Sequence, residues 1–140
     1  HRMMTAPVRT KTGALIKTKK GLAQGNKLNF LLNNFYLHYI FDEWMQKNHP
    51  KVPFERYTDD IVCHCKSESI AKELLSQIQE RFRDHKLVTH PQKTKIVYCK
   101  DANRKGNYPN VSFEFLGSTF CSRKIKSKSG NYIARFIPKL

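Results

Sequence analysis

The sequence predicts an α+β fold with two helices and antiparallel strands in the split βαββαβ (ferredoxin-like) order, lacking the first strand, plus a C-terminal β-hairpin. Two segments carry apolar residues at helical spacing, and a His-Pro pair follows each of them. Short runs rich in β-branched and aromatic residues lie between and after these segments. The resulting order is helix, strand, strand, helix, strand and then a β-rich tail.

The first helix is expected over residues 28–47. Residues 1–12 before it have no regular pattern, residues 13–18 (GALIKT) favour a short strand, and Gly21 to Gly25 supply a flexible turn. Asn26 or Asn29 is available as the helix cap. The helical spacing is carried by Leu28, Leu31, Leu32, Phe35, Tyr39 and Trp44.

A hairpin and a second helix follow. Residues 52–58 and 61–65 predict two strands that only Asp59-Asp60 separates. The second helix is expected over residues 67–85, where Glu68 precedes Lys72 by four residues. Its apolar side has four-residue steps at Ile70, Leu74, Ile78 and Phe82.

The C-terminal part is predicted to be rich in strands. Residues 95–99 (KIVYC) favour one strand, and residues 113–121 favour two short strands that meet at Gly117. Residues 132–138 add one more. We therefore expect a basic N-terminal segment at 1–20, a main body at 21–112, and a hairpin with a basic C-terminal segment at 113–140.

The charge of the chain is strongly basic and unevenly distributed. Lys and Arg number 26 against 11 Asp and Glu, a formal net charge of +15. Residues 1–27 hold seven basic and no acidic residues, residues 28–85 seven against nine, and residues 86–140 twelve against two. Basic flanks around an acidic middle indicate a polyanionic partner, for which we expect nucleic acid. An anionic membrane surface is the weaker alternative, because no basic amphipathic helix with a clean apolar face is present.

The composition also limits the class of protein. With 140 residues, 39% of them hydrophobic, the chain can form one domain or a piece of a larger enzyme, and its start at His1 is compatible with the second. No stretch approaches the roughly 18 apolar residues of a membrane helix, and no signal segment opens the chain, so we expect an intracellular protein without a membrane partner. The four scattered cysteines are expected to be reduced.

Two adjacent carboxylates, Asp59 and Asp60, interrupt the segment FERYTDDIVCHC. Successive strand residues point to opposite faces, so the pair can serve one site only if the chain turns there. Like charges held close raise each other's pKa unless cations offset them, and clustered oxygen ligands are typical of divalent metal sites. Two other interpretations stay open: an exposed turn without chemistry, because Asp favours turns, and pairing of Arg56 with one carboxylate.

A zinc site is a further alternative, offered by Cys63, His64, Cys65, Cys99 and Cys121. Cys63 and Cys65 share a strand face, whereas structural zinc sites usually draw paired ligands from turns. Small buried thiols are therefore the favoured interpretation.

Four segments resemble the motifs of reverse transcriptases, in the family's order. GLAQG at 21–25, with the helix after it, resembles motif B; RYTDDIVCHC at 56–65 resembles motif C, the Y-x-D-D box; HPQKTKIVYC at 90–99 resembles motif D; FEFLGSTF at 113–120 resembles the motif that grips the primer. The spacing and flanks are most similar to bacterial group II intron-encoded reverse transcriptases (maturases). The resemblance covers about residues 21–121 and implies a polymerase palm.

The resemblance implies a two-metal nucleotidyl transfer with Mg²⁺, in which Asp59 and Asp60 are the catalytic and metal-binding residues. Tyr57 would lie near the primer end. Lys93 would contact phosphate or protonate pyrophosphate, with Lys95 as its rival and a solvated lysine as the plain alternative.

Two further groups of residues have implied contacts. Along the nascent base pair, the glycines would allow close backbone approach and the glutamine would supply a donor and an acceptor; these residues are Gly21, Gln24 and Gly25. The primer strand would be supported by Phe115, Leu116 and Gly117. A core hairpin explains Phe115 and Leu116 equally well.

The chain departs from the family's pattern at three places. Ala23-Gln24-Gly25-Asn26 replaces the frequent Pro-Gln-Gly-Gly of motif B, and Thr58 replaces a common Ala. The family's metal site also takes an Asp from a strand upstream of motif B, but no acidic residue precedes Asp42. The fingers lie upstream and the thumb downstream. We therefore expect an RNA-directed DNA polymerase in the full-length protein and an inactive isolated chain.

The resemblance also implies the partners: an RNA template, a DNA primer, dNTPs and intron RNA, in a ribonucleoprotein of the bacterial cytoplasm. A catalytically silent RNA-binding module with a palm fold is the alternative, and retron or diversity-generating reverse transcriptases stay open. Loss of the central first strand would leave strand edges unpaired. We expect residues 13–18 or a second copy of the chain, as a dimer or strand-swapped oligomer, to take its place.

Overall fold

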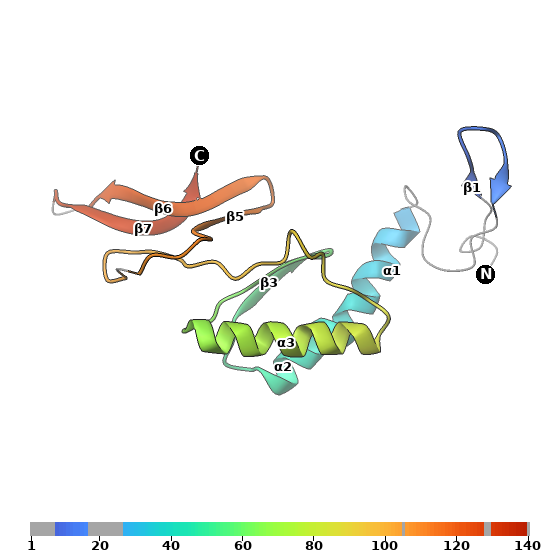
Figure 1. The fold of residues 1–140 in the computed structure, drawn as a ribbon, viewed down its shortest axis with the longest axis horizontal. Helices are drawn as coiled ribbons and strands as arrows, with labels where there is room; N and C mark the ends of the chain where they lie inside the picture. The colour runs from blue at the N-terminus through green and yellow to red at the C-terminus, as the bar shows by residue number, and fades with distance from the viewer. Residues whose placement is uncertain (1–7, 17–26, 105, 128–129, 140) are drawn as a thin grey trace. The chain divides into compact units, whose positions relative to one another are not determined.

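The structure, a computed structural model, describes residues 8–16, 27–104, 106–127 and 130–139. It confirms the α+β class and the antiparallel pairing of the strands (Figure 1).

Two compact units are present, residues 1–51 and 52–140, and each is described by itself. The predicted functional boundaries at residues 20 and 112 stay a prediction. The elements are β1 (Val8–Arg9), β2 (Leu15–Ile16), α1 (Lys27–Leu37), η1 (His38–Asp42), α2 (Glu43–Asn48), β3 (Phe54–Tyr57), β4 (Asp60–Cys63), α3 (Glu68–Asp84), β5 (Ser112–Phe115), β6 (Ser118–Lys126) and β7 (Tyr132–Lys139).

A small hairpin lies near the start of the first unit. Val8 pairs with Ile16 and Arg9 with Leu15, so a two-residue strand stands where the sequence predicted irregular chain. The strand expected over 13–18 is limited to β2, and residues 17 and 18 lie outside the described residues. The strand β2 is paired with β1, so its ladder gives no support to the idea that it replaces a missing strand of the palm sheet.

The first predicted helix forms as a continuous run from Lys27 to Asn48. A π-helical turn, η1, divides it at His38–Asp42, which the apolar spacing did not predict. Such turns insert one extra residue per turn and so rotate the side chains that follow. The buried apolar side chains of this run gather at and beside the π turn: Leu37, Ile40, Phe41 and Met45.

The second predicted helix is confirmed as α3 in the second unit. Ser67 caps its N-terminus by accepting a hydrogen bond from the Ile70 amide at 3.3 Å. The expected ion pair joins Lys72 Nζ to Glu68 Oε1 at 2.7 Å. Two of its four periodic apolar residues, Leu74 and Phe82, are buried.

The C-terminal end of α3 has the hydrogen-bond pattern of a Schellman motif. The Leu87 amide donates to the Phe82 carbonyl at 2.8 Å, and the Lys86 amide donates to the Arg83 carbonyl at 3.0 Å. Lys86 has a φ of 59°, the left-handed conformation that this motif usually assigns to glycine. The helix therefore stops before the His90-Pro91 pair that predicted its end.

Within the described residues the strands form three antiparallel sheets, whereas the sequence predicted one shared palm sheet and a C-terminal hairpin. The sheets are β1–β2, β3–β4 and the three-stranded β5–β6–β7. The expected hairpin at 113–121 is confirmed. Strand β7 adds a third strand beside β6, and its pairing runs from Lys126 opposite Tyr132 to Thr119 opposite Lys139. A three-ring stack forms on one face of this sheet, where Phe113 lies 5.0 Å from Phe120 and 5.8 Å from Phe136 between ring centroids.

The strand predicted at 95–99 is absent, because its backbone partners lie in a loop. The Tyr98 amide donates to the Asn110 carbonyl at 2.8 Å, and Asn110 Nδ2 donates to the Ile96 carbonyl at 3.2 Å. The Tyr98 hydroxyl accepts from the Gly106 amide at 3.0 Å, and the Tyr98 ring lies 4.4 Å from that of Tyr108. These contacts close a loop instead of extending a ladder.

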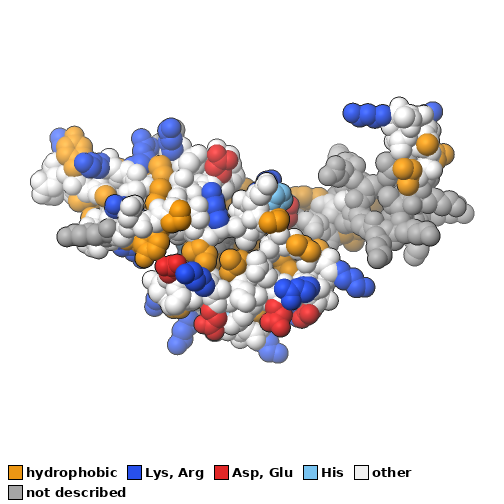
Figure 2. Space-filling model, in the orientation of Figure 1, with side chains coloured by type: hydrophobic (Ala, Val, Ile, Leu, Met, Phe, Trp, Pro, Cys, Tyr) orange, Lys and Arg blue, Asp and Glu red, His pale blue; other side chains and the backbone are white. Residues whose placement is uncertain are grey.

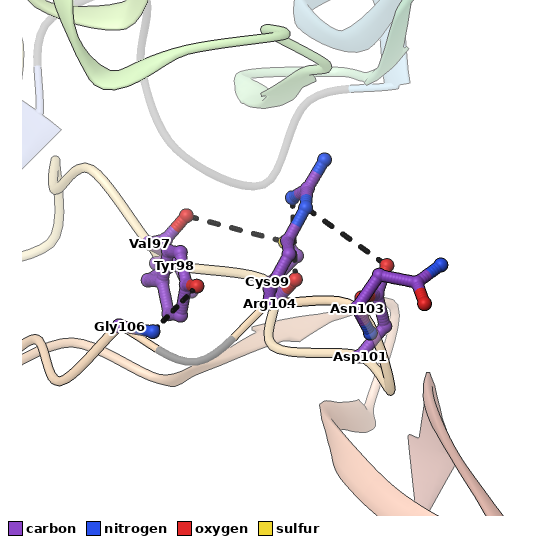
Figure 3. Close-up of polar contacts among 7 residues, drawn as sticks. All are labelled: Val97, Tyr98, Cys99, Asp101, Asn103, Arg104 and Gly106. Atoms are coloured by element: carbon purple, nitrogen blue, oxygen red, sulfur yellow. Dashed lines mark hydrogen bonds and ion pairs between the residues drawn. The ribbon is translucent and has the colours of Figure 1, made fainter.

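Side-chain contacts brace the middle of that loop (Figure 3). Arg104 Nη1 donates to the Cys99 carbonyl at 3.2 Å, and Asp101 Oδ1 accepts from the Asn103 amide at 2.9 Å. A Cβ atom added to Gly106 would lie 2.5 Å from the Tyr108 ring. A larger residue at position 106 would therefore have to displace the Tyr108 ring.

Candidate active site

The two carboxylates lie at the turn of a hairpin formed by β3 and β4, which we name the carboxylate hairpin. In its register Arg56 is opposite Ile61 and Tyr57 is opposite Asp60. Thr58 and Asp59 are therefore the two loop residues. Asp59 and Asp60 can serve one site only if the chain turns where they lie, and this turn is present.

The backbone of this turn is strained at Thr58, whose φ is 55°. A β-branched residue rarely adopts positive φ, and such conformations cost about 1–3 kcal/mol each. Positive φ at the first loop residue alone is the φ pattern of a type II′ turn, which normally has glycine there. The surrounding structure must therefore hold Thr58 in place.

Two hydrogen bonds hold the turn. Arg56 Nη1 donates to the Thr58 carbonyl at 2.9 Å, and the Thr58 hydroxyl donates to Asp59 Oδ1 at 2.8 Å. The first bond fixes the strained peptide, and the second fixes one oxygen of the first carboxylate. The neighbours thus preorganise Asp59 before any ligand arrives.

The chemistry-bearing side chains of the turn are exposed, as a site for a large polyanion requires. Asp59 and Asp60 are both exposed, and Tyr57 keeps 54% of its surface accessible. Tyr57 and Asp60 are cross-strand partners, so their side chains share one face of the hairpin. Ile61, Val62 and Cys63 beyond the turn are half-buried. The hairpin therefore combines a packed base with an acidic tip.

Cys63 at the end of the hairpin and Cys65 just after it are packing groups. Burial raises the pKa of the Cys63 thiol to about 12, with Cys65 and Glu55 as smaller causes, and burial also raises the pKa of Cys65. Raised pKa values keep both thiols protonated at neutral pH, whereas zinc binds the thiolate. His64 Nε2 lies 2.6 Å from Glu55 Oε2. The described residues contain no group of three or more His, Cys, Asp and Glu that could hold a metal ion, so the zinc alternative gains no support.

The chemistry of the carboxylate pair fits a divalent cation of the Mg²⁺ class. Such ions prefer oxygen ligands and are commonly held by one or two carboxylates together with substrate phosphates. Asp59 and Asp60 offer carboxylate oxygens on adjacent exposed residues. They can supply part of a cation site, with the remaining ligands from other groups and from a bound substrate.

A comparison with protein families decides the class of this chain. The model of the family described as "Reverse transcriptase (RNA-dependent DNA polymerase)" matches residues 1–120. The chain belongs to the reverse transcriptase family. Searches of curated proteins and of solved structures returned no match. Reverse transcriptases generally use divalent metal ions and act on a nucleic-acid template with nucleotide substrates, which agrees with the acidic turn and the basic chain.

The other predicted site residues of this reverse transcriptase segment lie in three places. Gly21, Gln24 and Gly25 fall outside the described residues. Lys93 is exposed in a turn that His90 organises, since His90 Nδ1 accepts from the Lys93 amide at 3.4 Å and the His90 carbonyl accepts from the Thr94 amide at 2.9 Å. Lys95 is also exposed, so either lysine could be the one that contacts phosphate.

The predicted primer-grip residues form the second hairpin turn of the unit, between β5 and β6, which we name the grip hairpin. Phe115 pairs with Ser118, which leaves Leu116 and Gly117 as the two loop residues. Both have positive φ, 50° and 74°, the φ pattern of a type I′ turn. Leu116 is 57% exposed and Phe115 is half-buried, so the turn presents an apolar tip.

Sequence reasoning missed the part played by Arg56 and Thr58. It offered Arg56 as a partner of a carboxylate and treated Thr58 as a small departure from the family pattern. In the structure Arg56 holds the Thr58 carbonyl and Thr58 holds Asp59. A β-branched residue at the first position of a two-residue hairpin loop is the signal that could have indicated strain.

Proposed function

We propose that this chain is the palm segment of an RNA-directed DNA polymerase of the bacterial group II intron type, with the carboxylate hairpin as part of its active site. The observation that carries the proposal is the exposed Asp59-Asp60 pair at a strained, hydrogen-bonded turn in a chain of the reverse transcriptase family. The subtype rests on the spacing and flanks of the four motifs in the sequence.

The reaction joins the primer 3′-oxygen to the α-phosphorus of a dNTP and releases pyrophosphate. Asp59 and Asp60 would hold Mg²⁺, which when bound stabilises the charge that develops on the attacking and leaving oxygens. Tyr57, on the face of Asp60, would limit where the primer end lies. Lys93 or Lys95 would contact the triphosphate, because exposed ammonium groups are suitable donors to phosphate.

The proposal assigns this chemistry to a longer protein. Two carboxylates are fewer than the family's metal site uses, so the 140 residues alone would bind nucleic acid but not extend a primer. Intron RNA is the proposed additional partner, in a ribonucleoprotein of the bacterial cytoplasm. The reduced state of all four cysteines is compatible with this location.

Primer extension on an RNA template tests the proposal in the full reading frame that contains this chain. Asp59→Asn should lower Mg²⁺-dependent extension by about three orders of magnitude, since several kcal/mol of transition-state stabilisation are lost. RNA binding should stay within a factor of about two, because the change removes no Lys or Arg that contacts phosphate. Glu114→Gln, which removes an exposed carboxylate of β5, is the matched control and should extend normally.

Extension by Asp59→Asn at the normal rate would contradict the catalytic assignment. If the parent protein binds RNA but does not extend a primer at any Mg²⁺ concentration, the chain is instead a catalytically silent RNA-binding module with a palm fold.

A further inference from the structure

Two arginines lie directly opposite each other on the C-terminal sheet. Arg123 of β6 is the cross-strand partner of Arg135 of β7, and both are exposed. Directly opposite residues have Cβ atoms about 4.5–5.5 Å apart, and like charges at this separation destabilise a sheet. The pairing thus lowers the stability of the protein alone, and an anion bound between the two guanidinium groups would relieve this repulsion.

No ion pair with a carboxylate neutralises the arginine pair in the part of the chain that the structure describes. Across residues 8–16, 27–104, 106–127 and 130–139, neither guanidinium forms a salt bridge with Asp or Glu. Glu114, the acidic residue of the β5–β6–β7 sheet, is opposite Thr119, four residues along β6 from Arg123. That separation is roughly 13 Å along a strand, beyond a Debye length at physiological salt. Asp101 comes nearer to β7, because the Ala102 amide donates to the Ala134 carbonyl at 3.1 Å, but its ion pair is with Arg104, at 3.9 Å.

The rows beside the pair on the same face are uncharged and half-buried: Cys121 opposite Ile137, and Ile125 opposite Ile133. The arginine stems can therefore lie on an apolar surface while their charged ends reach solvent. An anion that meets both guanidinium groups there is screened less than on a fully hydrated surface. Figure 2 shows Lys and Arg side chains beside hydrophobic ones over the region of this sheet.

We propose that Arg123 and Arg135 form a binding site for the phosphodiester backbone of nucleic acid. The guanidinium group presents a rigid fork that matches phosphate oxygens in a bidentate manner, and two opposed forks can grip one phosphate or two successive ones. On the face of the arginine pair, Lys139 lies four residues along β7 from Arg135 and adds a third positive charge that complements a polyanion. The proposal rests on the proposed function only for the identity of the ligand as nucleic acid.

The opposite face of the same sheet supplies a matched control. Lys124 and Lys126 alternate with Arg123 along β6, so their side chains project to the other face, opposite Ala134 and Tyr132. Removing these two lysines changes the net charge as much as removing the two arginines. A general electrostatic attraction would respond equally to both changes, whereas a built site responds to one.

Fluorescence anisotropy with labelled single-stranded RNA and with a labelled RNA–DNA hybrid tests the site in the 140-residue chain. The double variant Arg123→Gln/Arg135→Gln should bind about ten-fold or more weakly. The slope of log K against log salt should become shallower by the amount that about two phosphate contacts contribute. Lys124→Gln/Lys126→Gln should change the affinity less than three-fold. A preference for one probe would identify the template strand or the hybrid as the source of the phosphates.

Unfolding does not explain the expected loss, because removal of a like-charge pair should leave the melting temperature of the free arginine variant equal to or above that of the parent. Equal losses in the two double variants, or no loss in the arginine variant, would overturn the proposal. The same binding measurements, repeated in the Asp59→Asn background, separate this site from the active site. If the arginine double variant still binds more weakly than the lysine double variant there, the arginine site is supported. That result holds even if Asp59→Asn extends primers normally in the full reading frame.

Discussion

Two hairpins of the second unit, β3–β4 and β5–β6, each turn through two residues and each place a non-glycine residue at positive φ. The carboxylate hairpin holds Thr58 with polar contacts, from Arg56 to its carbonyl and from its hydroxyl to Asp59. The grip hairpin holds Leu116 beside Gly117, over a sheet with stacked phenylalanine rings. The same turn length thus serves a charged tip in one hairpin and an apolar tip in the other.

The difference shows how a strained turn depends on what lies below it. Polar clamps act through single atoms, so they fix the direction of a carboxylate but contribute about 1 kcal/mol each to stability. Ring stacks contribute through buried area and do not orient the turn residues. Substitutions in the carboxylate hairpin are therefore expected to change primer extension most, and substitutions in the grip hairpin are expected to change the free energy of unfolding most.

The largest effect that separates the hairpins is expected for Phe113→Ala. Phe113 stacks on both Phe120 and Phe136, so its loss should lower the free energy of unfolding of the C-terminal sheet by about 2–3 kcal/mol, less than for a fully buried ring. Hydrogen exchange should accelerate at the Phe120 amide. Tyr132→Ala, which removes an exposed ring from β7, is the control. Equal acceleration at the Val62 amide of the carboxylate hairpin would show that the two hairpins do not unfold separately.

Substitutions at the two turns should change the free energy of unfolding by less, and in opposite directions. Gly117→Ala should lower the free energy of unfolding by about 1–2 kcal/mol, because alanine is strained at a φ of 74°. Thr58→Gly should leave it unchanged or raise it by up to about 1 kcal/mol, because strain at Thr58 is relieved while chain entropy is lost. Urea denaturation measures both.

The turn exchange also separates stability from chemistry. Primer extension should be slower for Thr58→Gly than for Thr58→Ser, because serine keeps the hydroxyl that donates to Asp59. Equal destabilisation by Thr58→Gly and Gly117→Ala would contradict the view that the Thr58 backbone is held against its preference.

An effect that is absent at neutral pH concerns the base of the carboxylate hairpin under alkaline conditions. The pKa of Cys63 is raised by burial to about 12, so the folded state retains the thiol proton at pH values where the unfolded state releases it. This contribution to stability is complete below about pH 9 and decreases as the pH rises from 9 to 12. Cys63→Ala should flatten the decrease in that window, measured by urea denaturation at pH 8 to 11. Cys121→Ala on β6 is the control, and identical pH profiles for Cys63→Ala and the parent would contradict the burial effect.

Local sequence patterns predicted the helices and both hairpins because their causes are local. Ser67 caps α3 through its own side chain, and the four-residue steps of α3 bury Leu74 and Phe82. Residues 95–99 have an equally good strand pattern, but a strand needs a second strand as its partner. Their partner, Asn110, lies in a loop, which no local pattern reveals.

The candidate site was predictable in its residues but not in its support. Two adjacent Asp residues between strand patterns were enough to predict an acidic turn. The identity of the loop residues depends on the register, which the structure fixes by pairing Tyr57 with Asp60. The clamp from Arg56 and the opposed Arg123 and Arg135 also depend on cross-strand registers. Side chains far apart in the sequence meet there, and composition alone only indicates their excess charge.

The two-residue length of the Thr58-Asp59 loop limits which natural variants this hairpin can accept. One inserted residue would either bulge the turn or shift the pairing of β4 by one position, and a shift moves every β4 side chain to the other face. Asp60 would then leave the face of Tyr57, and the half-buried Ile61 and Cys63 would exchange places with their neighbours. Sequences descended from this one should therefore vary in the identity of residue 58 more readily than in the number of residues between Tyr57 and Asp60.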